Sequence, residues 1–257
     1  MKEIIEKYFE KNRDFMVEDI AKLVRIKSDK QEAKEGKPFG EGPAEVLAVA
    51  LEIASKMGFK THNYDNYAGA IDLNDHERKL DILAHLDVVP AGNGWSITEP
   101  FEPLVRDGRI YGRGTTDDKG PAVAALYAMK AVKDLNIPIK AGVRLILGTD
   151  EECGSSDIRY YYGIEPEAPM TFSPDTGFPV VNIEKGGLQG RFVYELEGSN
   201  KTPRVTALRA GVKSNVVPGD SIAVVEGMGP EEIERYCKAV SERTGVFFDL
   251  STGGNTT

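Results

Sequence analysis

The pattern of apolar and polar residues divides the chain into a first part that mixes helical and strand-like segments and a second part richer in strands. Helical segments are predicted over residues 1–27, 45–57, 121–135 and 155–162. Compact apolar runs predict strands over residues 59–63, 67–73, 80–89, 143–149 and 170–173. Unbroken apolar runs are typical of strands buried on both faces of a parallel sheet. We therefore predict an α/β fold with a mixed, mostly parallel sheet flanked by helices.

Two turn and boundary signals complete the predicted organisation. Asp107-Gly108, inside the run 104–111, predicts a tight β-hairpin. After about residue 184 the strand-like runs 188–196, 204–210, 221–225 and 247–250 surround a single helical segment at 230–243. This pattern predicts one domain over residues 1–184 and the beginning of a second, α+β domain over residues 185–257.

Composition and charge exclude several classes of function. The 257-residue chain has a formal net charge of -9 and scattered basic residues, so we expect no nucleic-acid partner. It has no apolar stretch of about 18 residues, so we expect no membrane-spanning helix. The N-terminus has no apolar signal segment and the chain has only two cysteines, which favours a cytoplasmic location.

Metal-binding and acid–base side chains lie at or just after the ends of three predicted strands: His85 and Asp87, Asp150-Glu151-Glu152, and Asp175. Ligands of open α/β sheets gather at the carboxyl ends of parallel strands, so these residues are expected to converge. One histidine and several carboxylates can hold a divalent metal ion, and we expect two ions. Taken singly, each has a simpler explanation: a histidine hydrogen-bonded at a strand end, a charged loop and a turn.

A glycine-bracketed segment, Gly112 to Gly120, carries two further carboxylates, Asp117 and Asp118, just before a predicted helix. Glycine permits close backbone approach, and carboxylates are favourable at a helix start. A helix cap plus one solvated aspartate would explain one carboxylate but not the glycine pattern. Within 150–152, a bound cation would offset the repulsion between adjacent carboxylates, with one ligating and its neighbour acting as general base.

Together these motifs resemble those of the M20 metallopeptidases, and most closely the PepV/Sapep-type dipeptidases. The resemblance rests on His-x-Asp at 85–87, Gly-Arg-Gly-x-x-Asp-x-Lys-Gly at 112–120, Glu-Glu at 151–152, the later Asp175, and Ser-Asn-Val-Val-Pro at 214–218. It implies a zinc-dependent exopeptidase-like catalytic domain, of which residues 1–184 are the N-terminal part, followed by the start of a ferredoxin-like lid domain over 185–257.

The resemblance also implies a ligand set for two divalent ions, Zn²⁺ or alternatively Mn²⁺. His85 and Asp175 would hold one ion, Glu152 would hold the other, and Asp117 would bridge both. The Asp117–Asp118 peptide bond is expected to be cis.

Further residues have catalytic roles implied by the resemblance. Glu151 would be the general base that takes a proton from water and passes it to the leaving amine. Asp87 would orient His85, and Asn215 would reach the substrate carbonyl. The implied reaction is hydrolysis of dipeptides by a water molecule activated by two metal ions.

The chain departs from the family pattern because family members are expected to be considerably longer. Its only histidines are His62, His76 and His85, so a lid histidine and a late metal-binding histidine are missing. We therefore expect an N-terminal fragment with weak or absent activity, and a complementing C-terminal chain as a possible partner. The alternatives are an M20 deacylase acting on N-acyl amino acids and a non-catalytic metal-binding fragment.

Overall fold

A computed structural model describes residues 1–177, 179–183, 185–188, 190–193, 201–211 and 217–253. The chain divides into two compact units, Met1–Asn182 and Ile183–Thr257, and each is described by itself. Among the described residues, no helix is both long and apolar enough to cross a membrane.

The first unit is built on a five-stranded sheet with the order β1-β2-β6-β3-β7. The strands are β1 (Lys60–Tyr64), β2 (Ala68–Asp72), β3 (Arg78–His85), β6 (Gly142–Gly148) and β7 (Met170–Phe172). β3 pairs in parallel with both β6 and β7, whereas β2 pairs antiparallel with β1 and β6. Only β2 therefore runs against the other strands of this sheet, which confirms the predicted mixed, mostly parallel arrangement.

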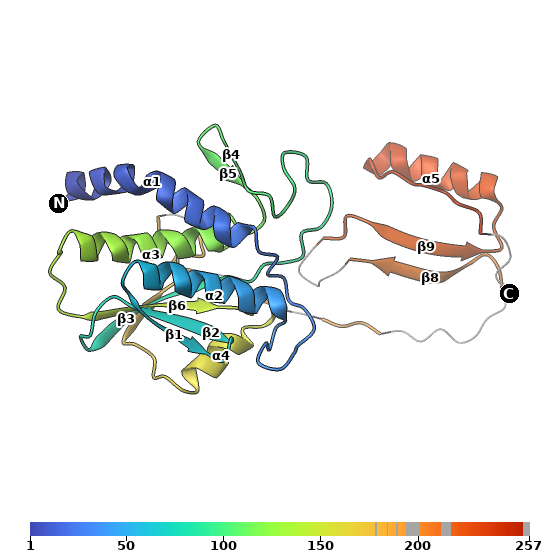
Figure 1. Ribbon diagram of the computed structural model, residues 1–257. Coiled ribbons are helices and arrows are strands. Elements are labelled where there is room, and N and C mark those ends of the chain that lie inside the picture. Colours follow the sequence, from blue (N-terminus) through green and yellow to red (C-terminus); the bar gives the residue numbers. More distant parts are fainter. Residues whose placement is uncertain (178, 184, 189, 194–200, 212–216, 254–257) are drawn as a thin grey trace. The chain divides into compact units, whose positions relative to one another are not determined.

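Helices cover both faces of this sheet (Figure 1). α1 (Lys2–Val24), α2 (Glu41–Lys56) and α3 (Lys119–Asp134) pack on one face, and the short α4 (Ser156–Tyr162) packs on the other. The sequence predicted all four, with boundaries that differ by a few residues. The helices on the first face enclose the larger hydrophobic core.

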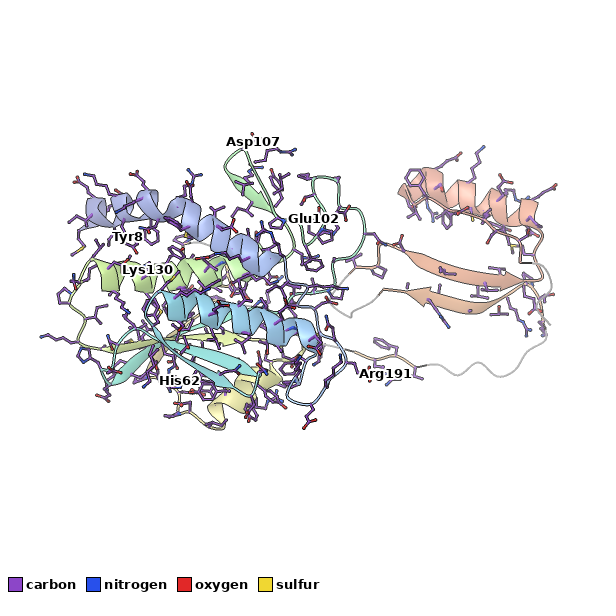
Figure 2. The ribbon with its side chains drawn as sticks, in the orientation of Figure 1. Tyr8, His62, Glu102, Asp107, Lys130 and Arg191 are labelled. Atoms are coloured by element: carbon purple, nitrogen blue, oxygen red, sulfur yellow. The ribbon has the colours of Figure 1, made fainter. Side chains whose placement is uncertain are left out.

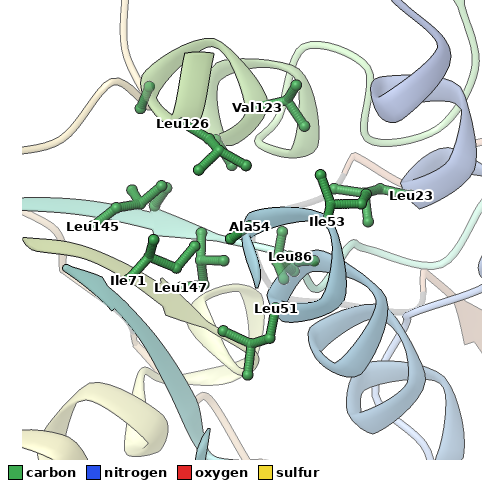
Figure 3. Packing of buried hydrophobic residues seen from close by; sticks show 14 of the residues in the cluster. Leu23, Leu51, Ile53, Ala54, Ile71, Leu86, Val123, Leu126, Leu145 and Leu147 are labelled. Atoms are coloured by element: carbon green, nitrogen blue, oxygen red, sulfur yellow. The ribbon is translucent and has the colours of Figure 1, made fainter. Parts of the chain in front are cut away.

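Side chains of the central strand β6 point alternately to the two faces of the sheet, so this strand contributes to both hydrophobic clusters. Successive strand residues point to opposite faces. Leu145 and Leu147 point into the larger core, where Figure 3 shows them near Ile71 and Leu126, whereas Ile146 packs in the smaller cluster beneath Tyr161. Full burial of such a side chain stabilises the fold by about 1.5–3 kcal/mol.

The predicted hairpin is confirmed and projects from the first unit. β4 (Leu104–Arg106) and β5 (Arg109–Tyr111) pair antiparallel around Asp107 and Gly108, whose φ angles are 52° and 72°. Two positive φ angles are the mark of the type I′ turn that suits an Asp-Gly pair. Figure 2 shows Asp107 at the tip of this hairpin.

The second unit contains an antiparallel pair, β8 (Arg204–Ala210) and β9 (Ser221–Glu226), and the helix α5 (Pro230–Thr244). α5 begins at a proline, which has no backbone N–H to satisfy, and is followed by Gly245 with a φ of 75°. These elements agree with the predicted start of an α+β unit.

Two strand predictions in the second unit fail on the described residues. Residues 247–250 form no strand, and neither do residues 188 and 190–193 of the predicted run 188–196, whose remaining residues lie outside the described ones. Phe192 and Phe247 are almost fully exposed. An apolar run becomes a strand only where a neighbouring backbone satisfies its N–H and C=O groups, and the described residues give these runs no such neighbour.

Candidate metal centre

The polar ends of the parallel strands meet at one edge of the sheet, as the sequence predicted. His85, the last residue of β3, lies in register with Gly148, the last residue of β6. Asp87 therefore emerges beside the segment that begins at Thr149. β7 pairs with β3 on its other side, so the segment leading to Asp175 emerges at the same edge.

Three of the predicted metal ligands come together at this edge. His85 Nε2 lies 3.1 Å from Asp117 Oδ1 and 3.3 Å from Asp175 Oδ2. One ligand atom from each residue falls within a group whose members are all within 4.8 Å of one another. His85 Nε2 is buried, and among the described residues it has no hydrogen-bond partner of good geometry.

The donor set and its spacing fit a divalent cation. Ligand atoms about 2.0–2.1 Å from a tetrahedral zinc ion lie about 3.3 Å from each other, close to both separations from His85 Nε2. Nε2 has no hydrogen bond of good geometry among the described residues, and once the ring gives up its second proton it would present a lone pair to a cation. A cation would also reduce the repulsion between Asp117 and Asp175. His85, Asp117 and Asp175 thus form a candidate metal site.

Asp87 occupies the other side of the histidine ring. His85 Nδ1 lies 3.1 Å from the backbone oxygen of Asp87 and 3.3 Å from its Oδ1. Because both neighbours are acceptors, Nδ1 carries a proton and donates it to them, so Nε2 is the ring nitrogen that faces the two carboxylates. The same Asp87 side chain accepts hydrogen bonds from the backbone N–H groups of Glu151 and Glu152, each at 3.1 Å. One buried carboxylate therefore joins the histidine to the acidic turn formed by residues 150–152.

The surrounding charges shift the protonation equilibria of the cluster. Burial of the His85 ring opposes protonation, but the Asp117 and Asp87 carboxylates outweigh it and raise its pKa to about 11. Burial raises the pKa of Asp175, and of Glu151, although the nearby His85 opposes both increases. The metal-free cluster therefore holds a proton on His85 that a bound cation would displace.

The two adjacent aspartates of the glycine-bracketed segment have different surroundings. The Asp117 side chain reaches the cluster, whereas Asp118 turns inward and accepts a hydrogen bond of 3.0 Å from the backbone N–H of His85. Burial raises the pKa of Asp118 to about 7. The peptide bond between them is cis, as the family resemblance implied.

Lys119 anchors this segment to the first helix. Its side chain is fully buried, and Nζ donates hydrogen bonds of 2.9 and 2.8 Å to the backbone oxygens of Leu23 and Ile26. Carbonyl groups at a helix end lack partners within the helix, so a lysine there satisfies them. This buried contact could not be predicted from the sequence, because lysine is normally a surface residue.

The remaining predicted residues stand at different distances from the cluster. Glu151 Oε2 lies 3.9 Å from His85 Nε2, at the margin of the site. The Glu152 carboxylate is not a member of the three-residue group, although its backbone N–H is bound to Asp87. Asn215 lies outside the described residues.

Asp157 is a supporting residue that the sequence reasoning missed. Its Oδ2 accepts hydrogen bonds from the backbone N–H groups of Thr149 and Asp150, at 2.6 and 2.8 Å, and so holds the start of the acidic turn. Lys30 forms a 2.7 Å ion pair with Asp150 on the same turn. Nothing in the spacing of Asp157 within its short helix distinguishes it from a solvated carboxylate.

Fold and cluster together define an α/β protein with a candidate divalent-metal site at the carboxyl edge of its sheet. The model of peptidase family M20/M25/M40 matches residues 82–254, about two thirds of the chain. The chain belongs to this family, as the sequence motifs predicted.

Curated relatives agree with this assignment, and a solved structure shares the fold. The chain is 40% identical over 227 residues to "Putative dipeptidase YtjP" of Bacillus subtilis (strain 168), covering 87% of this chain and 49% of the relative. It is 35% identical over 228 residues to "Beta-Ala-Xaa dipeptidase" of Lactobacillus delbrueckii subsp. lactis, covering 88% and 48%. The chain thus spans about half the length of these relatives. Its fold resembles human carnosine dipeptidase 1, with a TM-score of 0.56, 24% identity, and coverage of 67% and 41%.

Proposed function

We propose that this chain supplies the metal-binding half of a metal-dependent dipeptidase. The convergence of Asp117 and Asp175 on the buried Nε2 of His85, which has no hydrogen bond of good geometry among the described residues, carries the proposal. Family membership and the dipeptidase names of two relatives support peptide-bond hydrolysis, with dipeptides as the substrate class. We further propose two ions, zinc or alternatively manganese, with Asp117 shared between them and Glu152 holding the second.

The proposed mechanism assigns the proton transfers to Glu151. Bound divalent ions would supply a Lewis acid that polarises the scissile carbonyl and activates a water. Glu151 lies at the margin of the cluster, and burial raises its pKa, which strengthens it as a base. It would take a proton from the water and deliver it to the leaving amine. Asp87 would keep His85 Nδ1 protonated, so that Nε2 remains available as a ligand.

The proposed domain roles follow the predicted boundaries. Residues 1–184 would form the N-terminal part of the catalytic domain, and residues 185–257 the start of a lid domain from which Asn215 would reach the substrate carbonyl. The cytoplasmic location stays a prediction.

The experiment that tests the function combines metal binding with dipeptide hydrolysis. We expect Glu151→Ala to abolish hydrolysis in the presence of zinc or manganese while retaining metal, because Glu151 lies beside the three-residue group without belonging to it. Glu102→Ala, which removes an exposed carboxylate on a surface loop (Figure 2), is the matched control and should change neither property. Loss of metal in Glu151→Ala would show that the base assignment is wrong.

One observation favours a second candidate, a non-catalytic metal-binding chain. The described cluster holds ligands for one ion, and Glu152 is not part of it. Binding of a single zinc ion without hydrolysis of any dipeptide would support this candidate. Hydrolysis of N-acetyl amino acids in preference to dipeptides would instead support the deacylase.

A further inference from the structure

An open groove lies beside the metal-binding segment in the first unit. Its volume is about 400 Å³, within the range of small-molecule sites, and its walls are the loop 93–98 and the segment formed by residues 110–112, 115 and 116. Thr116, a lining residue, directly precedes Asp117 in the chain. Since consecutive Cα atoms are about 3.8 Å apart, one end of the groove lies next to the candidate metal site.

The loop wall of the groove is held in a fixed position. Trp95 Nε1 donates a hydrogen bond of 2.9 Å to the backbone oxygen of Ala91, and Arg113 Nη2 donates one of 3.2 Å to the same oxygen. The Arg113 guanidinium also lies over the Trp95 ring, 5.4 Å from its centroid. Trp95 therefore both lines this groove and anchors its loop.

The opposite wall is fixed by two glycines. Gly112, which lines the groove, has a φ of 155°, and a Cβ there would lie 2.9 Å from the Val24 side chain. Gly114 has a φ of 84°, and a Cβ there would lie 2.9 Å from the Val88 side chain. The backbone between groove and cluster therefore packs too closely for other residues, which fixes the position of the groove relative to Asp117.

The groove differs from the neighbouring cluster in its charge. None of its lining residues is charged, and they combine apolar groups, among them Trp95, Ile97 and Tyr111, with hydroxyl and amide groups. A charged side chain entering it would lose hydration and meet no opposite charge on a lining residue, since the guanidinium groups of Arg113 and Arg106 are stacked on the Trp95 and Tyr111 rings. An apolar or aromatic side chain would gain burial and ring contacts. The cluster beside it is strongly acidic and suits a cationic amine.

We propose that this groove binds one uncharged side chain of a peptide substrate and so selects against peptides with a charged side chain at that position. The inference rests on the proposed function, because it takes the occupant to be part of the molecule hydrolysed at the adjacent cluster. Trp95 supplies a ring face for the occupant, and Ile97, 44% exposed at the rim, supplies apolar contact.

Trp95 is the only tryptophan of the chain, so its fluorescence reports occupancy of the groove directly. The full chain, with and without zinc, is titrated with Phe-Gly and Gly-Phe and with the corresponding glutamate and lysine dipeptides. We expect a saturable change in emission for at least one phenylalanine dipeptide, and binding on the order of tenfold weaker for the charged counterparts. Absence of a saturable change, or equal binding of charged and uncharged dipeptides, would overturn the proposal.

A pair of variants separates the groove from its surroundings. Ile97→Asp should weaken phenylalanine-dipeptide binding on the order of tenfold, since it places a charge against an uncharged side chain. Ile4→Asp introduces the same charge at an exposed isoleucine of α1 that does not line the groove, and should leave binding unchanged. Equal weakening by both variants would contradict a local effect.

Zinc calorimetry on the same samples distinguishes failure of the groove from failure of the proposed function. Zinc binding and Glu151-dependent hydrolysis without dipeptide selectivity would refute the groove alone. Selective dipeptide binding by a chain that binds no zinc would retain the groove and refute the proposed function.

Discussion

Replacing Asp87 by asparagine tests whether one buried carboxylate couples the histidine to the acidic turn. Asp87 is 1% exposed, and its two oxygens accept the backbone N–H groups of Glu151 and Glu152 while Oδ1 faces His85 Nδ1 at 3.3 Å. The asparagine amide nitrogen cannot accept, so one N–H group loses its partner. A hydrogen bond to a charged group contributes about 1.5–3 kcal/mol, and we expect the free energy of unfolding to fall by that amount.

The effect on metal binding should accompany this loss of stability. Without the negative charge beside Nδ1, the ring is a weaker ligand and its orientation is less fixed. Changes in the residues that orient metal ligands typically weaken affinity by about 10–100-fold, and we expect Asp87→Asn to fall in this range for zinc.

Asp157→Asn is the matched control for this experiment. Asp157 is also fully buried and also accepts backbone N–H groups, from Thr149, Asp150 and Ile158, but none of these hydrogen bonds involves His85. Urea unfolding of the metal-free chains should show similar losses for both variants, whereas zinc calorimetry should show a marked loss of affinity only for Asp87→Asn. Equal loss of zinc affinity in the two variants would refute a specific role of Asp87.

Two further predictions concern protonation and the anchoring lysine. Because the folded-state pKa of His85 is raised from 6.5 to about 11, its contribution to the stability of the metal-free chain is complete below about pH 6.5 and is lost as the pH rises toward 11. Zinc should displace this proton, so calorimetry in buffers of different ionisation enthalpy should show about one proton released per zinc at pH 7, and none in His85→Gln. Lys119→Met removes the buried donor to the carbonyl groups of Leu23 and Ile26. Leu23 keeps a 3.2 Å hydrogen bond from the Ile26 backbone N–H, so one carbonyl loses its donor and the free energy of unfolding should fall by about 1–3 kcal/mol. Lys130→Met is the control, because it removes a partly exposed lysine of α3 that pairs with Asp134 of the same helix (Figure 2), and it should change the free energy of unfolding by less than about 1 kcal/mol. Equal losses for the two variants in urea unfolding would contradict the anchoring role of Lys119.

The residues that end strands were predictable from the sequence, because hydrophobic runs locate strands and parallel strands share their carboxyl edge. This reasoning placed His85 and Asp175 at one edge of the sheet, whereas Asp117 was assigned to the same site through the family resemblance. The supporting residues were not predictable in the same way. Lys119 is buried against spatial neighbours distant in sequence, and Asp157 accepts hydrogen bonds from the end of a strand whose position its own helix does not reveal.

The strand predictions in the second unit failed for a related reason. An apolar run such as 247–250 carries the same local signal as β7, but a strand also needs a partner. β7 is three residues long and exposed, yet it forms because β3 lies beside it. Local pattern therefore predicts a strand reliably only where the rest of the sheet can be assigned as well.

The three clustered residues all come from the first unit, so metal binding can be tested separately from the second unit. His85, Asp117 and Asp175 all belong to the unit Met1–Asn182, and so do the contacts that hold His85 and Asp117, including Asp87, Asp118 and Lys119. None of these contacts depends on the second unit. Metal binding should therefore be measurable on this chain even if hydrolysis also requires residues present only in relatives of twice its length. Zinc affinity that survives removal of residues 183–257 would support this separation of binding from catalysis, and its loss would show that the second unit contributes to the site.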